Sequence, residues 1–277
     1  MRFLKQFLPV VAVAFVGGRL TMAVESSAVL TLVVGVLSAV LAVFVYAWAV
    51  RWSERRPADE VAAKGAAGRL AVGTAIGVGW FGAVIANITF LGWYRVDGFG
   101  TVSGPVGLFG FMAAAAVTEE LMFRGVLFRL LEERAGTWVT MAVTSVLFGL
   151  WHMLNPDATL WGAVAIALSA GLALAAAYVA TRDLWVPIGL HFGWNFAESA
   201  IFGTEVSGNG DNDGILRGVT SGSDVITGGR FGPEASPYTI VFGLLLTAAF
   251  LWVARGRGNL VPRRRRAPAA AAATLAQ

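Results

Sequence analysis

Long apolar segments recur along this 277-residue chain, and they constrain its fold more than any other feature. Most of them approach or exceed the roughly 18–20 residues that an α-helix needs to cross a bilayer. They lack the alternation of apolar and polar residues that marks the strands of a membrane barrel. The sequence therefore predicts an all-α, polytopic membrane helix bundle of about eight transmembrane helices. We place the spans near residues 6–24, 28–50, 70–93, 105–122, 138–154, 159–180, 185–203 and 238–254.

The basic residues indicate which helix ends face the cytoplasm. With the N-terminus inside, only Arg19, Arg95, Arg217 and Arg230 of the 21 Lys and Arg residues fall on the outer side. This is the positive-inside pattern, and it predicts cytoplasmic N- and C-termini. We expect a multi-pass protein of the cell membrane, in a bacterium, because the Ala-rich composition is typical of GC-rich bacterial genomes. Although the pI is near 10, we expect the basic tail to contact anionic lipid rather than nucleic acid.

The chain divides by composition into a hairpin, a linker, a core and a tail. The first helix has a basic start, but Thr21-Met22-Ala23 is a poor signal-peptidase site, so we expect the helix to be retained. The hairpin carries no charged pair or polar ladder, which predicts a packing role. The predicted parts are a 1–52 N-terminal transmembrane hairpin, a 53–69 cytoplasmic linker, a 70–254 catalytic core that includes a 204–236 extracytoplasmic Gly/Asp-rich loop, and a 255–277 basic cytoplasmic tail.

Two short strings in the 204–236 loop resemble known motifs, but both are rejected. Asp211-Asn212-Asp213-Gly214 lacks the later ligands and the closing Glu of a calcium loop. Gly208-Asn209-Gly210-Asp211 matches the GxGD string of intramembrane aspartyl proteases, which need two aspartates in one buried site. No aspartate lies within any predicted span. The chain also has no cysteine, which excludes thiol nucleophiles and thiolate metal sites.

The segment FMAAAAVTEELMFRGVLF carries three ionisable residues through an apolar stretch, where charges are costly and usually functional. Glu120 and Arg124 are four residues apart on one helical face, in the favourable order, so we expect them to pair. Glu119 is turned about 100° away from Glu120 and faces elsewhere. The alternative is that both acids end the span at the headgroups, with Arg124 extended toward water. We expect a structural role for the pair and a chemical role for Glu119.

The two histidines of the chain lie in two further apolar segments. Phe148 and His152 share one helical face, so the aromatic ring should form a wall beside the imidazole. His191 and Asn195 are also four residues apart, and Gly193 between them lets another backbone approach closely. An imidazole and a carboxamide on one helical face can both donate hydrogen bonds to the oxyanion that forms in acyl transfer. The alternative is an interhelical hydrogen bond that serves only packing.

Together these side chains predict a hydrolytic site. Glu119 and His152 would act as the base for a water molecule, and His191 and Asn195 would donate hydrogen bonds to the oxyanion. Counting at about 1.5 Å per residue puts Glu119 and His191 about 9 Å from the cytoplasmic surface, but His152 more than about 20 Å deep. The helix of His152 must then be short, tilted or begin deeper. A proline after the motif favours an early stop, so we expect the 155–158 turn to be buried in protein.

The motifs occur in one order along the chain, as Glu119-Glu120-x-x-x-Arg124, Phe148-x-x-x-His152 and His191-x-x-x-Asn195. This ordered set resembles the CPBP family of intramembrane proteases, which comprises type II CAAX prenyl proteases and bacterial relatives linked to bacteriocin processing or immunity. The resemblance covers about residues 70–254 and implies an eight-helix fold with endopeptidase activity. It implies catalytic roles for Glu119, His152, His191 and Asn195, with Glu120 and Arg124 in support, while Phe148 is expected to support His152.

Members of this family are often labelled metalloproteases, so the need for a metal has to be considered. One acid and two histidines suit a His₂Glu zinc site, here Glu119, His152 and His191. No HExxH helix is present, however, and the three ligands would come from separate spans. Asn195 suits an oxyanion better than a zinc ion. We therefore expect a glutamate-activated water with no cofactor required, and zinc as the alternative.

The predicted function is that of an intramembrane endopeptidase that cleaves a membrane-anchored protein or peptide near its cytoplasmic end. The alternative is a non-enzymatic membrane immunity or peptide-binding protein on the same fold. A proton-coupled transporter would show inverted repeats and broken helices in matched halves, which we do not find. Rhomboid-type proteolysis needs a serine in a GxSG-like setting within a span, and none is present. Bacteria generally lack prenylated CAAX proteins, so a literal CAAX substrate is not expected.

Overall fold

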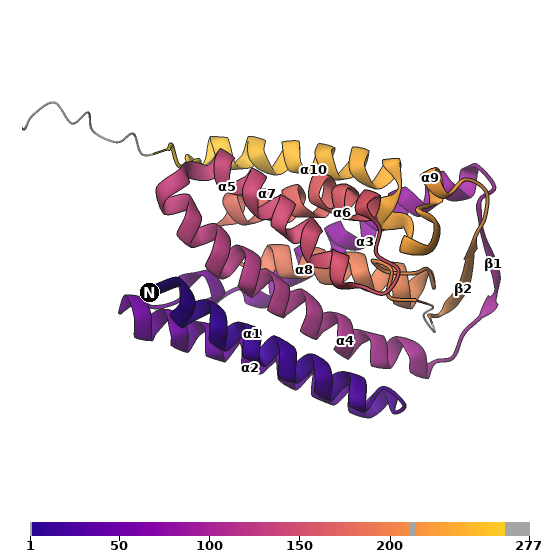
Figure 1. Ribbon diagram of the computed structural model, residues 1–277, viewed down its shortest axis with the longest axis horizontal. Coiled ribbons are helices and arrows are strands. Elements are labelled where there is room, and N and C mark those ends of the chain that lie inside the picture. Colours follow the sequence, from indigo (N-terminus) through magenta and orange to yellow (C-terminus); the bar gives the residue numbers. More distant parts are fainter. Residues whose placement is uncertain (1, 211–213, 264–277) are drawn as a thin grey trace, which may run out of the picture.

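The computed structural model describes residues 2–210 and 214–263 and shows a bundle of long helices (Figure 1). The residues of the rejected calcium-loop string at 211–213 and the basic residues predicted to contact lipid, within 264–277, lie outside the described residues. The helices are α1 (Arg2–Ala23), α2 (Ala28–Glu54), α3 (Ala66–Phe90), α4 (Ser103–Glu120), α5 (Arg129–Trp151), α6 (Leu160–Ile166), α7 (Leu172–Thr181), α8 (Trp185–Phe196), α9 (Asp224–Thr227) and α10 (Pro237–Gly256).

The helical, membrane-spanning character predicted from the sequence is confirmed, but the number of eight spans is not. Among residues 2–210 and 214–263, six helical stretches are long and apolar enough to cross a membrane. The fourth and fifth predicted spans fall within one of these, Ser103–Leu154. The seventh predicted span is helical only from Trp185 to Ile201. It consists of α8 followed by one π-helical turn, Ala197–Ile201. The other five stretches are Arg2–Ala23, Ala28–Glu54, Ala66–Phe90, Leu160–Thr181 and Pro237–Gly256.

The helix that begins with α4 does not end where the sequence predicted. The spans predicted at 105–122 and 138–154 left residues 123–137 as a connection between helices, but the chain continues as a π-helix over Leu121–Phe128 and then as α5. Seven of these eight π-helical residues are buried, because their side chains are almost all apolar. The break comes only at Gly136, whose φ of 75° favours glycine. A Cβ there would also lie 2.7 Å from the backbone nitrogen of Arg263.

Helix α8 lies in the middle of the bundle, where it packs against α3, α4 and α7 (Figure 1). Its close approach to α3 requires glycine at two positions. A Cβ on Gly189 would lie 2.2 Å from the carbonyl oxygen of Leu70, and one on Gly193 would lie 2.3 Å from that of Thr74. Small residues at a helix contact let backbones meet closely, which is how helices associate in lipid. The backbone approach predicted at Gly193 is confirmed.

The hairpin of α1 and α2 is fastened to the core by a polar network at one end, which the sequence did not predict. Glu54, the last residue of α2, accepts hydrogen bonds from Gln6 at 2.8 Å and from Arg129 at 2.9 Å. The buried hydroxyl of Tyr46 donates to the carbonyl of Gly125 at 3.0 Å. These polar residues are spread singly over distant segments, so no local pattern reveals them.

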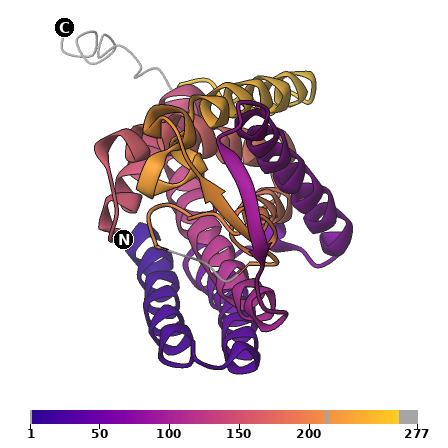
Figure 2. The same cartoon turned by 90° about the vertical axis from the view of Figure 1, so that its right-hand side faces the viewer.

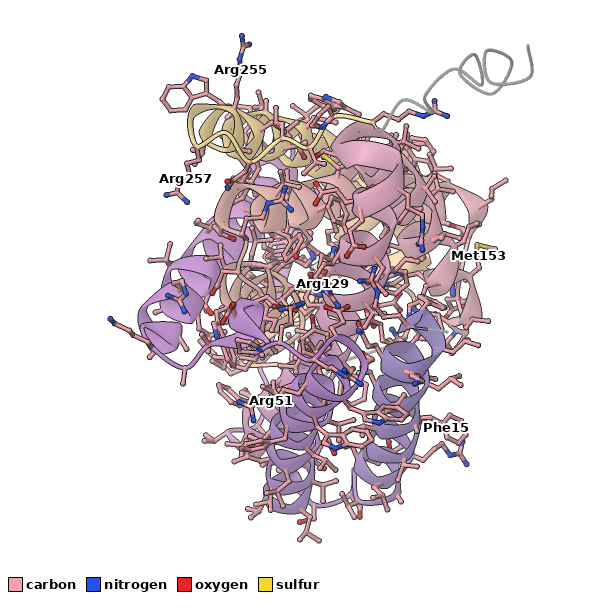
Figure 3. All side chains as sticks on the ribbon, turned by 90° about the vertical axis from the view of Figure 1, so that its left-hand side faces the viewer. Phe15, Arg51, Arg129, Met153, Arg255 and Arg257 are labelled. Atoms are coloured by element: carbon pink, nitrogen blue, oxygen red, sulfur yellow. The ribbon has the colours of Figure 1, made fainter. Side chains whose placement is uncertain are left out.

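Two short strands join the loops at one end of the bundle, an addition to the all-α prediction. Strand β1 (Tyr94–Phe99) pairs antiparallel with β2 (Leu216–Thr220), and Tyr94 lies opposite Thr220 (Figure 2). The N-terminus of α1 lies at the other end, as Figure 1 shows. Figure 3 looks onto that other end, where Arg51, Arg129, Arg255 and Arg257 are labelled. The bundle thus has a strand-bearing end and an arginine-rich end.

Candidate active site

Glu120 lies at the centre of a buried network that joins two of the predicted motifs. One of its oxygens accepts a hydrogen bond from Arg124 at 2.7 Å and lies 3.0 Å from Nδ1 of His191. Arg124 is 2% exposed, and it also donates to the carbonyl of Gly171 at 3.2 Å. The predicted pair of Glu120 and Arg124 therefore forms, and the alternative in which Arg124 extends toward water is wrong.

Glu119 points away from that pair, as helix geometry predicted. Its Oε2 lies 4.0 Å from Nε2 of His191. This oxygen is buried, and within residues 2–210 and 214–263 it has no hydrogen-bond partner. The two neighbouring acids thus have different surroundings. Glu120 is neutralised by an arginine, whereas the carboxylate of Glu119 is left facing a cavity.

His152 follows the last turn of α5 and is held by its own helix. Its Nδ1 lies 2.8 Å from the carbonyl oxygen of Phe148. Because a carbonyl only accepts, we assign the proton to Nδ1, which leaves a lone pair on Nε2 of the neutral ring. The ring of Phe148 lies 4.9 Å from that of His152 and 5.9 Å from that of His191, centre to centre. Phe148 therefore contacts both imidazoles, more than the sequence predicted.

All four residues predicted to carry the chemistry line one cavity of about 770 Å³, namely Glu119, His152, His191 and Asn195. The wall opposite α8 comes from α4 and from the hairpin. The hairpin was predicted only to pack against the core, but it also lines the cavity. It supplies Thr21, Met22, Glu25, Ser26, Ala28 and Thr31.

The cavity opens at the strand-bearing end of the bundle. Most of its exposed lining residues are found at and after the end of α1, at the start of α4 and in the loops, namely Met22, Glu25, Ser26, Ser103, Pro156 and Asn209. Two exposed aromatic residues, Phe111 on α4 and Trp151 on α5, also line it. Its buried lining residues include His152, His191 and Asn195. The sequence placed the site near the arginine-rich end, so the cleavage position inferred from that placement is not supported.

The continuous helix explains the depth mismatch found in the sequence. Glu119 precedes the break at Gly136 by about as many residues as His152 follows it. At about 1.5 Å per residue, both lie about 25 Å along their helices from that break. His191 is near the start of α8, but α8 begins inside the bundle, since Leu184 just before it is fully buried. The predicted short or tilted helix is therefore not needed.

The turn at 155–158 is not buried as predicted. Pro156 is exposed, and its three neighbours are half-buried. The turn is instead held against the 204–236 loop, because Asn155 donates to the carbonyl of Ser207 at 2.8 Å and the Asp157 amide donates to that of Gly208 at 2.9 Å. Residues of the 204–236 loop, rather than transmembrane helices, thus cover one side of the 155–158 turn.

The 204–236 loop brings a further acid to the site, which the sequence did not predict. Residues 231–236 are buried, and Glu234 among them lines a small cavity together with His152 and His191. Its carboxylate accepts hydrogen bonds from the indole of Trp194, at 3.2 Å, and from the hydroxyl of Ser207. Burial, only partly offset by His152 and Ser207, raises the pKa of Glu234. The only feature of the sequence that could have indicated a buried Glu234 is that few large polar residues surround it in the loop.

Glu198 was also missed. It lies one turn beyond Asn195, is fully buried, and neither carboxylate oxygen has a hydrogen-bond partner in the part of the chain that the structure describes. Its charge would interact with that of Glu234. Glu234 and Glu198 are thus two buried acids near the site, in addition to Glu119 and Glu120 beside His191.

The donor set does not form a metal site in this arrangement. Over residues 2–210 and 214–263, no three His, Cys, Asp or Glu side chains are grouped so that they could hold a metal ion. The candidate ligands Glu119, His152 and His191 line one cavity but do not form such a group.

Comparison with known proteins gives one match. Residues 101–197 match the family of Rce1-like type II CAAX prenyl endopeptidases. No curated protein and no solved structure matches the chain. The matched segment runs from just before the start of α4 to just past the end of α8, so it contains every residue of the three motifs. This match supports the resemblance to CAAX proteases that the motifs predicted, over the segment that carries them.

Proposed function

We propose that this chain is an intramembrane endopeptidase that hydrolyses a peptide bond of a membrane-associated protein or peptide. The observation that supports this most is the carboxylate of Glu119. It has an oxygen without a partner among the described residues, it lies 4.0 Å from an imidazole nitrogen, and it faces a cavity that also reaches His152 and Asn195. A carboxylate with one buried oxygen that has no partner is costly within a membrane bundle unless it has a chemical task.

Glu119 and His152 are the proposed bases. A water molecule between them gives its proton to a carboxylate oxygen of Glu119 or to Nε2 of His152 as its oxygen attacks the scissile carbonyl carbon. The same groups then return the proton to the leaving amine nitrogen, so that the catalyst is restored. Base catalysis of this kind contributes about 10²–10⁴ in rate.

His191 and Asn195 are the proposed donors to the oxyanion. Two carboxylates, Glu119 and Glu120, and one guanidinium, Arg124, leave one excess negative charge around His191. A proton on both nitrogens of His191 cancels that charge in a low-dielectric site. Nδ1–H then donates to Glu120, and Nε2–H is free for the developing oxyanion beside the amide of Asn195. Preorganised donors of this type are worth about 10²–10³ in rate each.

Zinc is kept as an alternative activator of the water. Glu119, His152 and His191 would be its ligands, and the ion would lower the pKa of a bound water molecule. Because these side chains do not form a group that could hold a metal ion, they would have to move to bind it. The proposed mechanism therefore relies on side chains alone.

The decisive experiment compares the parent chain with Glu119→Gln. The full-length proteins are placed in nanodiscs and incubated with solubilised membrane proteins, and new peptide termini are identified by mass spectrometry. Glu119→Gln should abolish cleavage. Glu133→Gln is the matched control, because it removes the same charge from a partly exposed pair with Arg2 outside the cavity, and it should keep cleavage. Equal cleavage by the parent and Glu119→Gln would refute the proposal.

The same experiment separates an enzyme from a non-enzymatic immunity or peptide-binding protein on this fold. A protease that carries Glu119→Gln should still bind the peptide that the parent cleaves. A pure binding protein would yield no new termini in any variant, and its binding would be little affected by Glu119→Gln.

A further inference from the structure

We propose that the substrate enters the cavity from the extracytoplasmic side of the membrane, as an extended peptide segment with neutral or basic side chains. This inference rests on the proposed function, because only a protease has a peptide substrate to admit. The side from which the cavity opens and the sign of its charge are properties of the chain itself, so they are testable without proteolysis.

The first step is the position of the mouth. Ser26 lies in the turn that ends α1, Ser103 begins α4, and both are exposed lining residues of the cavity. Both elements reach the strand-bearing end of the bundle (Figures 1 and 2). His191 and Asn195, which are buried, lie deeper in the same cavity. The cavity is therefore a well that opens at the strand-bearing end.

The second step is the distribution of basic residues between the two ends. At the strand-bearing end, Arg95 is paired with Asp97 at 2.7 Å and Arg230 with Asp157 at 3.3 Å, and the remaining basic residues are Arg19 and Arg217. The helix ends and connections at the opposite end carry Arg2, Lys5, Arg51, Arg55, Arg56, Lys64, Arg69, Arg129, Arg134, Arg182, Arg255, Arg257 and Arg263 (Figure 3).

This asymmetry orients the bundle. An excess of Lys and Arg marks the cytoplasmic side of a membrane protein. Many of these residues are also connected to one another through acids, as in the ion pairs of Arg129 with Glu54 and of Arg182 with Glu132. The arginine-rich end thus forms one cytoplasmic face. The mouth of the cavity, at the other end, opens to the outside.

The third step is the charge of the cavity wall. Apart from the two histidines, its ionisable lining residues are both acids, Glu25 at the rim and Glu119 below, and no Lys or Arg lines it among the described residues. A substrate that bound through a free terminal carboxylate would find no Lys or Arg partner here, and Glu25 at the rim would repel acidic side chains. An internal segment with neutral or basic side chains fits this wall, because a cleft lined by one sign of charge concentrates ligands of the opposite sign.

The natural absence of cysteine makes a direct test possible. Single cysteines are introduced as Ser26→Cys at the mouth, Ala115→Cys in the cavity and Ala63→Cys in the exposed connection at the arginine-rich end. Intact cells are treated with membrane-impermeant methanethiosulfonates, and the labelled fraction is compared with that after lysis. Ser26→Cys and Ala115→Cys should be labelled in intact cells, and Ala63→Cys only after lysis.

A second measurement tests the charge of the wall. At Ala115→Cys, a cationic trimethylammonium reagent should react about ten-fold faster than an anionic sulfonate reagent, after correction for their rates with a free thiol. Adding Glu25→Gln should reduce this ratio. If Ala115→Cys does not fold, Ser103→Cys at the rim takes its place.

Several outcomes would overturn the inference. Labelling of Ala63→Cys but not Ser26→Cys in intact cells would reverse the orientation. Labelling of Ser26→Cys but not of a cavity cysteine would mean that the cavity is closed to the outside, and an equal or inverted reagent ratio would refute the acidic wall. None of these results depends on cleavage. Failure of Glu119→Gln to stop proteolysis would refute the proposed function while leaving the labelling pattern intact.

Discussion

Glu120 lies 3.0 Å from Nδ1 of His191, on a different helix, while it also binds Arg124. One buried carboxylate thus links the first and third motifs. Its removal would leave the guanidinium of Arg124 buried without its counter-ion and would free the imidazole of His191 to rotate. The network is therefore expected to carry stability as well as geometry.

Glu120→Gln should lower the free energy of unfolding by about 3–5 kcal/mol, because breaking a buried pair leaves an uncompensated charge. The measurement is thermal unfolding in detergent, followed by the fluorescence of the ten tryptophans. Glu133→Gln is the control, since it breaks the partly exposed pair with Arg2 and should cost less than about 1 kcal/mol. Similar losses in both variants would contradict the assignment of Glu120.

Asn195→Ala should lower kcat by about 10²–10³ with little change in KM, because an oxyanion donor acts mainly in the transition state. Cleavage kinetics on a peptide found with the parent enzyme would measure this. Asn209→Ala removes an amide from the rim of the same cavity and should leave kcat unchanged. An Asn195→Ala enzyme with normal kcat would exclude the proposed role.

Gly193→Ala should push α3 and α8 apart, because the added Cβ would lie 2.3 Å from the carbonyl oxygen of Thr74. Overpacking of this kind costs about 1–3 kcal/mol, and it should also displace His191 and reduce activity. Gly79→Ala on α3 is the matched control, since its Cβ meets no heavy atom within 4 Å. Unfolding temperature and cleavage rate are both measured, and a stable, active Gly193→Ala variant would be inconsistent with this contact.

Glu234 should give the stability of the protein a distinct pH dependence. Burial raises the pKa of Glu234 above the usual 4.5, so the folded chain keeps a proton that the unfolded chain releases. The stability from this proton is complete below the usual value and is lost as the pH rises through the raised one. Glu234→Gln cannot titrate, so the fall in unfolding temperature over this window should become shallower. Asp224→Asn removes an exposed acid at the start of α9 and should leave the slope unchanged. An unaltered slope for Glu234→Gln would contradict the prediction.

Prolonged dialysis against a strong chelator should leave the cleavage rate unchanged, because the proposed bases are Glu119 and His152 rather than a metal-bound hydroxide. The rate is measured before dialysis, after it and after addition of zinc. Activity that is lost on dialysis and restored by zinc would show that Glu119, His152 and His191 move together around an ion.

Contacts within one helix were predictable from the sequence, because they depend only on spacing. The pair of Glu120 with Arg124 and the contact of Phe148 with His152 each join residues four apart. Gly193 was predictable for the same reason, since a missing side chain signals a close neighbour. The same spacings of four residues make up the motifs on which the family resemblance rests.

Contacts between distant segments were not predictable in this way. Glu234 reaches His152 and His191 from a polar loop. Acids are common in such loops, so its presence there did not indicate a role in the site. The strand pairing of Tyr94 with Thr220 joins residues far apart in the chain. The helix past Glu120 was misread because Arg124 suggested a membrane surface, whereas the structure buries it.

The insertion of residues 231–236 among the helices limits how far this protein could be shortened or recombined. A chimera that kept every transmembrane helix but borrowed its outer loop from elsewhere would lose Glu234 from beside the imidazoles, together with Ser207 that binds it. Engineering of the outer surface must therefore treat this stretch as belonging to the interior.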